Sequence, residues 1–451
     1  MNHIIVVGGG LAGSEAAWQI AQRGIRVKLY EMRPEVSTGA HQTEDLAELI
    51  CSNSLGSDLP DRASGVLKAE LRHFNSLLLG IAEQTALPAG TALAVDRILF
   101  AKKVTEAIST HPNIEIIRQE FTEIPENLSV IASGPLTSSK LSKSISNFFG
   151  QDYLYFFDAI SPIVSAETID LSIAYRASRW NNGEQEDGDY INCPFHEKVD
   201  YLNFVESLRT AQRIKLQDFE LEIEEGVNAG PDVFFEGCLP VEIIASRGEK
   251  ALAYGPLRPV GLLDPRVPRQ PYAVVQLRQD NLAGDLYNIV GFQTNLTFPE
   301  QRRVFRMIPG LSRAEFIRYG QMHRNTFIAS PQLLKPTLQS NLRTDLFFAG
   351  QITGVEGYMG NIATGMLAGL NAARIFENKV PIELPRDTML GALCFYITHT
   401  EMKHFQPMKA NFGILPPLEI IPPKSNKRDR AMIYAERAKK SLSAFLENYD
   451  E

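Results

Sequence analysis

A glycine-rich turn near the start of the chain constrains its fold more than any other feature. The residues His3 to Val7 form a short β-branched run, which predicts a buried parallel strand, and Gly-Gly-Gly-Leu-Ala-Gly follows directly at 8–13. In such a G-x-G-x-x-G turn, one glycine permits the tight turn, one lets backbone amides approach a pyrophosphate, and one lets the next helix pack on the strand. The residues assigned to nucleotide binding are Gly8, Gly9, Gly10, Leu11, Ala12 and Gly13.

An acidic residue lies where a second strand should end. A helix is expected over 12–23 and a strand over 25–30, and Glu31 follows 31 − 13 = 18 residues after the last glycine. In dinucleotide-binding βαβ units, a carboxylate at about this distance (~20 residues) binds the adenosine ribose. The strands, glycines, helix and acid together predict an α/β nucleotide-binding domain in which Glu31 binds the ribose.

A later segment favours FAD over NAD as the nucleotide. Residues 345–350 form an apolar run that ends in glycine and resembles the second, C-terminal motif of two-motif FAD proteins. In those proteins this strand returns to the nucleotide domain, and the glycine-rich start of the next helix, here 357–365, lies against the flavin and ribitol. Gln351 stands where that motif usually has an acid. Further FAD contacts are expected from Gly350, Gln351, Gly357 and Asn361.

The two FAD motifs belong to one domain, so the chain between them must leave that domain and return to it. We expect a discontinuous FAD-binding Rossmann-like domain of the glutathione-reductase type over 1–150 and 321–451, with an inserted α+β domain over 151–320. The length of 451 residues fits two or three domains. Within the insertion, an amphipathic helix is expected over 204–225 and a strand over 272–278.

Composition narrows the class of protein. The sequence is 44% hydrophobic and 22% charged, without an apolar run long enough for a membrane span or an export signal, which predicts a soluble protein. The net charge of −8 means that any nucleic acid would have to bind at local basic patches. The four cysteines lack C-x-x-C spacing, which argues against a zinc site and against a disulfide framework and favours the cytoplasm.

Two of the cysteines stand in contexts that suggest chemistry. Cys51 lies in a polar stretch soon after the nucleotide motif, and Cys238 lies between a glycine and Leu-Pro with Glu236 nearby. A thiolate at either position could be a nucleophile, although a single cysteine is more often a small buried apolar residue. From the residues alone both interpretations stay open.

Three further features have a functional and a structural interpretation. The basic segment 258–278, which contains Tyr272, is compatible with phosphate binding and base stacking, or with a solvated loop. His323 could contact cofactor or substrate, or could be a hydrogen-bonded structural residue. The tail over 424–440 holds seven basic residues against two acidic ones and could be helical.

The motifs resemble those of the folate- and FAD-dependent tRNA (uracil-5-)-methyltransferases. Matching segments reach from the N-terminus to about residue 425, and in one departure Gly360-Asn361 stands where members have Glu-Ser. The resemblance implies formation of 5-methyluridine in the T-arm of tRNA, with methylenetetrahydrofolate as carbon donor, NADH or NADPH as co-substrate, and reduced FAD as methylene carrier and reductant. The matching segments lie at 8–17, 51–55, 234–240, 322–328, 349–358 and 405–413.

The same resemblance implies a role for each of the two cysteines. Uracil C5 is a poor nucleophile, so a thiolate adds to C6 and activates C5 for attack on a one-carbon electrophile. The resemblance assigns this addition to Cys238 and places Cys51 nearer the flavin, as an acid/base or as protection for a flavin intermediate. Three alternatives are the same chemistry on ribosomal RNA, a flavin oxidoreductase acting on a small metabolite, and a noncatalytic, flavin-stabilised RNA-binding protein.

Overall fold

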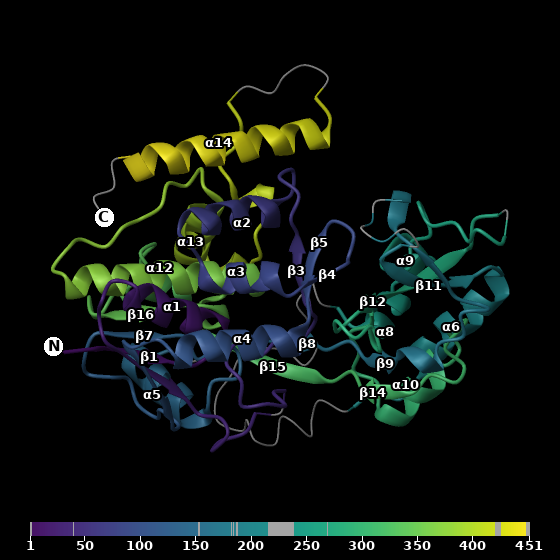
Figure 1. Cartoon of the computed structure of the whole chain (residues 1–451), viewed down its shortest axis with the longest axis horizontal. Coiled ribbons are helices and arrows are strands. Elements are labelled where there is room, and N and C mark those ends of the chain that lie inside the picture. Colours follow the sequence, from purple (N-terminus) through teal and green to yellow (C-terminus); the bar gives the residue numbers. More distant parts are fainter. Residues whose placement is uncertain are drawn as a thin grey trace.

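Two β-sheets lie toward opposite ends of the molecule's long axis, each with its own helices (Figure 1). The first gathers strands from both ends of the chain, and the second is built from the middle of the chain. This arrangement is seen in a computed structural model. The described residues are 2–38, 40–151, 154–181, 183, 185, 188–214, 239–267, 269–419 and 425–447, without the side chains of 154–159, 181, 323 and 324.

The first sheet has five parallel strands in the order β16-β7-β1-β2-β6. All four residues of β1 are buried, as expected for a parallel sheet covered on both faces. The segment predicted to return to the nucleotide domain does so, because β16 pairs with β7 and places Phe347 opposite Val130. The strands are β1 (Ile4–Val7), β2 (Val27–Glu31), β6 (Ile114–Arg118), β7 (Ser129–Ile131) and β16 (Leu346–Phe348).

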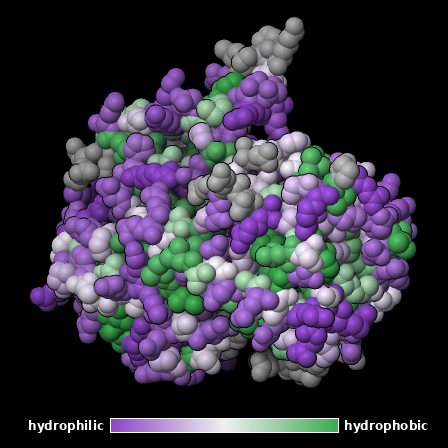
Figure 2. Space-filling view, turned by 45° about the vertical axis from the view of Figure 1, so that its right-hand side comes forward, coloured by the Kyte–Doolittle hydropathy of each residue, from purple (hydrophilic) through white to green (hydrophobic). Residues whose placement is uncertain are grey.

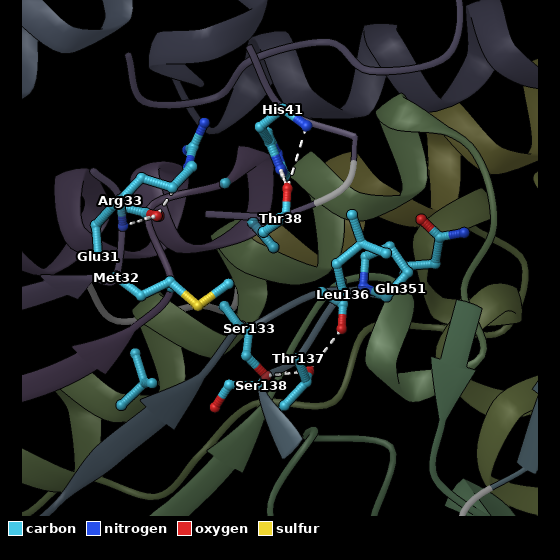
Figure 3. Close-up of a pocket in the computed structure, with 18 of the residues that line it drawn as sticks. Glu31, Met32, Arg33, Thr38, His41, Ser133, Leu136, Thr137, Ser138 and Gln351 are labelled. Carbon is cyan, nitrogen blue, oxygen red and sulfur yellow. Dashed lines mark hydrogen bonds and ion pairs between the residues drawn. The ribbon is translucent and has the colours of Figure 1, made fainter. Parts of the chain in front are cut away.

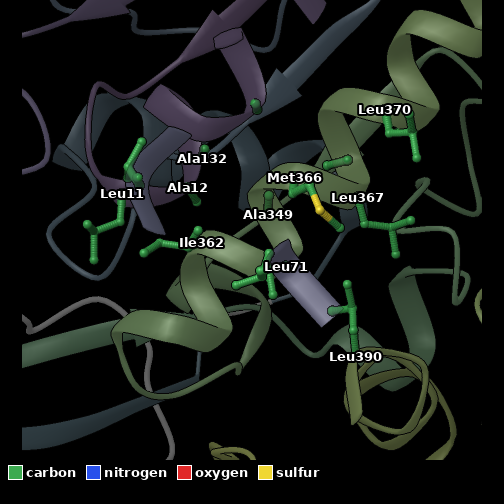
Figure 4. Close-up of a cluster of buried hydrophobic side chains, with 14 of the residues drawn as sticks. Leu11, Ala12, Leu71, Ala132, Ala349, Ile362, Met366, Leu367, Leu370 and Leu390 are labelled. Atoms are coloured by element: carbon green, nitrogen blue, oxygen red, sulfur yellow. The ribbon is translucent and has the colours of Figure 1, made fainter. Parts of the chain in front are cut away.

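Two helices that start at the edge of this sheet pack unusually close together. They are α1 (Leu11–Ala21), which follows the glycine-rich turn, and α12 (Tyr358–Phe376), which follows β16. A Cβ on Gly365 would lie 2.2 Å from the carbonyl oxygen of Ala12, so only glycine permits this approach. Figure 4 shows the small side chains of the contact beside Ile362 and Met366. The contact brings the first turns of both helices to one edge of the sheet.

Further helices complete the nucleotide domain, and a small antiparallel sheet of order β3-β5-β4 borders it on the side of the second large sheet (Figure 1). The helices are α2 (Ala63–His73), α3 (Leu77–Gln84), α4 (Arg97–Ser109), α5 (Ser139–Phe149), α11 (Ser330–Leu333) and α13 (Met389–His399). The short strands are β3 (Ser54–Ser57), β4 (Ala86–Leu87) and β5 (Ala92–Val95).

The second large sheet has six antiparallel strands in the order β10-β11-β12-β13-β9-β14. It shares an aromatic-rich core with the helices of this region, which makes the insertion an α+β unit. The strand expected over 272–278 is β12. The strands are β9 (Ile163–Ser165), β10 (Tyr175–Ala177), β11 (Tyr190–Phe195), β12 (Ala273–Gln279), β13 (Leu286–Ile289) and β14 (Phe316–Arg318). The helices are α6 (Lys198–Thr210), α8 (Val241–Ser246), α9 (Ala251–Tyr254) and α10 (Phe298–Phe305).

The chain enters and leaves the insertion through a paired connection, in which β8 (Leu154–Ala159) runs antiparallel to β15 (Met322–Phe327). The domain boundaries predicted at 150/151 and 320/321 lie beside these two strands and stay a prediction. The helix expected over 204–225 is α6, which begins at Lys198 and ends at Thr210. The expected extension is wrong for residues 211–214, which are not helical and in which Arg213 forms a β-bridge with Leu296. Residues 215–225 lie outside the described residues.

The basic tail is helical, as the sequence suggested. Helix α14 (Lys427–Glu447) lies across the top of the molecule in Figure 1, above α2 and α13. It packs on α2 and is buried at Ala431, Ala438 and Leu442. Among the helices that the structure describes, none is both long and apolar enough to span a bilayer.

Candidate active site

A cavity opens at the carboxyl ends of β1 and β2, the edge at which open α/β sheets bind their ligands. About 980 Å³ in it is not filled by atoms, open solvent included. Figure 3 shows Glu31 and Arg33 on one side, the segment 133–138 opposite, and Gln351 from the loop before α12. The cofactor residues predicted from the sequence that line it are Gly8, Gly10, Leu11, Ala12, Glu31, Gly350, Gln351 and Asn361.

The glycines of the turn have separate physical roles. A Cβ on Gly13 would lie 1.7 Å from the carbonyl oxygen of Gly8, so this glycine permits the packing of α1 on the turn. Gly8 has a φ of +101°, which side chains rarely allow. Around Gly10 a Cβ would meet nothing within 4 Å, so the backbone faces open space. The turn therefore exposes the backbone of Gly10 to the cavity. Gly9 donates its amide hydrogen to Glu31, and Gly13 lets α1 pack on the turn.

Glu31 is held as an ionised acceptor at one end of the cavity. Its Oε2 accepts the amide hydrogen of Gly9 (2.8 Å), and its Oε1 accepts hydrogen bonds from the backbone amide and Nε of Arg33 (3.0 and 2.9 Å). Burial alone would raise the pKa of Glu31, but the hydrogen bonds and charge of Arg33 lower it. Each carboxylate oxygen can accept more than one hydrogen, so Glu31 retains capacity for ribose hydroxyls.

The cavity also contains an unsatisfied acceptor. Asn361, in the first turn of α12, is 8% exposed, and its Oδ1 has no hydrogen-bond partner among the described residues. Gln351, in place of the usual acid, donates a hydrogen bond to Glu356 (2.9 Å). A ribose acceptor, an open glycine turn and a buried amide acceptor all line this cavity. These residues fit an extended dinucleotide such as FAD.

A second cavity adjoins the first at its Asn361 end. Both cavities are lined by Ile50, Pro135, Gln351, Tyr358 and Asn361. The second also contains Cys51 and Gly357, and it receives Gln293 from the insertion and Lys409 from the C-terminal segment. The structure therefore brings Cys51 next to the predicted flavin end of the nucleotide cavity.

The backbone around Cys51 is fixed by one hydroxyl and one buried amide. The hydroxyl of Tyr358 accepts hydrogen bonds from the amides of Cys51 (2.9 Å) and Ser52 (3.1 Å). Asn53, which is fully buried, donates through Nδ2 to the carbonyl oxygens of Val95 (3.0 Å) and Gln279 (2.9 Å). Burial, followed by the neighbouring Cys51, raises the pKa of Tyr358, so the phenol stays neutral.

Two arginines bring positive charge to the same loop. Arg97 donates to the carbonyl oxygen of Leu49 (3.3 Å) and forms an ion pair with Asp280 (2.5 Å), and Arg278 donates through Nε to Asn53 (2.8 Å). Burial lowers the pKa of Arg278, whereas Asp280 outweighs burial and raises that of Arg97. Both arginines interact electrostatically with Cys51. Since Arg278 and Asp280 belong to the insertion, that unit helps to complete the Cys51 site.

The remaining sequence candidates are distributed differently. Cys238 lies outside the described residues, and so does the side chain of His323. Cys193 and Cys394 are buried, which raises the pKa of both thiols and fits small apolar core residues. The site residues for which the sequence gave no role are Asn53, Arg97, Asp280 and Tyr358.

The interpretation of segment 258–278 as a phosphate-binding surface is wrong for Arg278, which is buried at 8% exposure. Arg266 pairs with Asp264 (2.9 Å) and Arg269 pairs with Glu197, but the side chains of the two arginines remain 40% and 57% exposed. For Arg266 and Arg269, phosphate binding stays a prediction.

Comparisons with known proteins agree with this geometry. The profile of the family described as "Glucose inhibited division protein A" matches residues 3–380. Two crystal forms of GidA from Aquifex aeolicus align with 99% and 98% of the chain and 76% of their own length, at TM-scores of 0.66 and 0.67 and identities of 16% and 17%. At this identity the likeness concerns the fold. Fold and site thus define a Rossmann-like dinucleotide-binding protein of the GidA type.

More similar sequences define the family within this class. A relative in Enterococcus faecalis named methylenetetrahydrofolate--tRNA-(uracil-5-)-methyltransferase TrmFO is 53% identical over 447 residues, which cover 99% of both chains. The relative of the same name in Ligilactobacillus salivarius is 53% identical over 446 residues, again covering 99% of both. The chain belongs to the TrmFO family.

Proposed function

We propose that this protein forms 5-methyluridine in the T-arm of tRNA, taking the carbon from methylenetetrahydrofolate and reducing equivalents from NADH or NADPH. The observation that carries the proposal is the junction of the two cavities, where the nucleotide site ends at Asn361 and Cys51 begins the adjoining site. The full-length likeness to relatives named for this reaction supports it.

The chain's own residues divide the work of holding the reactants. We propose that Glu31 binds the adenosine ribose, that the amides of the turn at 8–13 receive the pyrophosphate, and that Asn361 accepts a hydrogen bond from the flavin end of FAD. Bound FAD would supply the methylene transfer and the hydride that completes the methyl group. Tyr358 then holds the backbone of the Cys51 loop against this end of the cofactor site.

Two thiols have different roles in the proposal. Cys238 adds to C6 of uracil, which makes C5 nucleophilic, and its release restores the ring when the C5 proton leaves. Cys51 acts beside the flavin as acid/base or as a shield for a reactive flavin state. The nearby guanidinium groups of Arg97 and Arg278 favour a negative charge on its sulfur.

The test of these roles compares the variants Cys238→Ala and Cys51→Ala with Cys394→Ala as a matched control, since Cys394 is buried away from both cavities. Each purified variant is assayed for FAD content and for 5-methyluridine in an unmodified tRNA transcript. We expect both site variants to retain FAD and lose methylation, whereas the control retains both. Methylation by the Cys238→Ala variant would refute the role of Cys238 as nucleophile. Methylation by the Cys51→Ala variant would refute a role of Cys51 beside the flavin.

The choice of RNA is tested in the same assay. A T-arm stem-loop and a ribosomal RNA stem-loop of equal length are supplied separately, with NADPH oxidation followed in the absence of RNA. We expect methylation of the T-arm alone. Methylation of the ribosomal fragment alone would favour the ribosomal alternative, and NADPH oxidation without any RNA product would favour a small-molecule oxidoreductase.

We further propose that the chain divides into an FAD domain over 1–150 and 321–451 and an insertion over 151–320. One hydrophobic core contains only residues from outside 151–320 and another contains only residues from within it, which supports this division. A cytoplasmic location is part of the same proposal. It is supported by Cys193 and Cys394, which are free thiols, and by relatives named for a reaction on tRNA.

A further inference from the structure

Basic side chains gather beside the cavity that contains Cys51, although the net charge of the chain is −8. Lys409 lines the cavity itself, and Arg62 stands two residues before Ser64, which also lines it. In the first turn of α14, Arg428 lies beside Arg62, since both contact Asp61, and Lys427 and Arg430 belong to the same turn. We call these side chains the rim surface: Arg62, Lys409, Lys427, Arg428 and Arg430.

A buried carboxylate fixes the helix to the rim. Asp61 is 2% exposed and lies 2.8 Å from Nε of Arg428 and 3.4 Å from a terminal nitrogen of Arg62. The side chains of the two arginines remain 75% and 54% exposed. One buried charge therefore orients two guanidinium groups and leaves most of each facing solvent.

Unlike Arg428, neither Lys427 nor Arg430 has an evident benefit for the stability of α14. The helix macrodipole favours acidic residues in the first turn, but Lys427, Arg428 and Arg430 are basic and only Asp429 is acidic. Lys427 and Arg430 form no ion pair with any residue in the described part of the chain. In the space-filling view, hydrophilic residues predominate along the upper edge, where α14 lies in Figure 1 (Figure 2). A polyanion outside the protein would account for such a cluster.

We propose that the rim surface binds the phosphate backbone of the RNA beside the nucleotide that enters the Cys51 cavity. This inference rests on the proposed function and adds to it a surface that positions the substrate. Phosphate contacts fix the register of a nucleic acid without reading its sequence, which suits a surface at the edge of a cavity that must receive one base. A local cluster also explains how a chain of net charge −8 can hold RNA.

The test exploits a matched pair of sites on one helix. The double variant Lys427→Glu/Arg430→Glu changes the rim, and Lys439→Glu/Lys440→Glu makes the same change of charge on exposed residues further along α14. Since each helical residue rises about 1.5 Å, the control lies roughly 15 Å from the rim. FAD content and RNA-independent NADPH oxidation check that both variants are folded. T-arm RNA binding is then measured by fluorescence anisotropy over a series of salt concentrations.

We expect the rim variant to bind T-arm RNA at least ~10-fold more weakly, with the slope of log K against log salt reduced by about 2, because each lost phosphate contact removes roughly 0.9 from the slope of a duplex. The control should keep the wild-type slope and bind within ~2-fold of wild type. Equal effects of the two variants would overturn the proposal that the rim surface binds RNA. They would leave the proposed function unaffected. Failure of the wild type to bind or methylate T-arm RNA would overturn both.

Discussion

Removal of one oxygen atom at Tyr358 tests how the Cys51 loop is held. In Tyr358→Phe the ring remains, but the amides of Cys51 and Ser52 lose the acceptor that they share at 2.9 and 3.1 Å. An unsatisfied donor costs about 1–3 kcal/mol when water cannot reach it. Cys51 and Ser52 are half-buried, so we take the lower value for the pair, about 2 kcal/mol of local stability. Even the lower value corresponds to roughly 30-fold more frequent opening of the loop.

Hydrogen exchange followed by mass spectrometry reads this opening directly. The peptide that contains Cys51 and Ser52 should exchange faster in the variant, and methylation should fall while FAD absorbance is retained. Tyr396→Phe is the control, because it also removes a hydroxyl, which donates to Gln406 (3.2 Å) away from the loop. If the Cys51 peptide exchanges as slowly in Tyr358→Phe as in wild type, the reasoning that this hydroxyl holds the loop is refuted.

Three further predictions concern the fold and the cofactor site. Gly13→Ala should yield protein without FAD, because its Cβ would lie 1.7 Å from the oxygen of Gly8, whereas Gly80→Ala, with open space around its Cβ, should keep the flavin absorbance of wild type. Asn361→Leu should lower FAD affinity by roughly 10-fold in a titration of the apoprotein, since a buried acceptor is lost, and unchanged affinity would exclude this contact. Burial raises the pKa of Glu70 to about 7, so its contribution to stability should be present below pH ~4.5 and fall by roughly 3 kcal/mol as the pH rises to about 7. The free energy of unfolding of Glu70→Gln, measured across this pH range, should lack that fall. If it falls in parallel with that of wild type, the prediction is contradicted.

The parts of the site that the sequence predicted depend on local geometry. The turn at 8–13 and Glu31 belong to one βαβ unit, in which a fixed strand–helix–strand length brings the acid back to the glycines. The return of β16 to the sheet was predictable from its resemblance to a second FAD motif. Each of these inferences needed only a short stretch of sequence.

The support of Cys51 was not predictable in the same way, because its contacts join distant segments. Tyr358 lies 307 residues from Cys51, and Arg278 lies 225 residues from Asn53. Sequence separation also explains why the interpretation of segment 258–278 treated Arg278 as a surface cation. The sequence alone does not show that Asn53, its hydrogen-bond partner, lies against it. Tyr358 could have been suspected from its position directly after Gly357 in the predicted flavin motif.

The origin of the transferred carbon tests the central claim most directly. Purified protein is incubated with unmodified T-arm RNA, NADPH and methylenetetrahydrofolate that carries an isotopic label in its methylene group, and the RNA nucleosides are analysed by mass spectrometry. We predict labelled 5-methyluridine that requires both the folate and NADPH. 5-Methyluridine without the label, or labelled folate and oxidised NADPH without any methylated uridine, would contradict the proposed function.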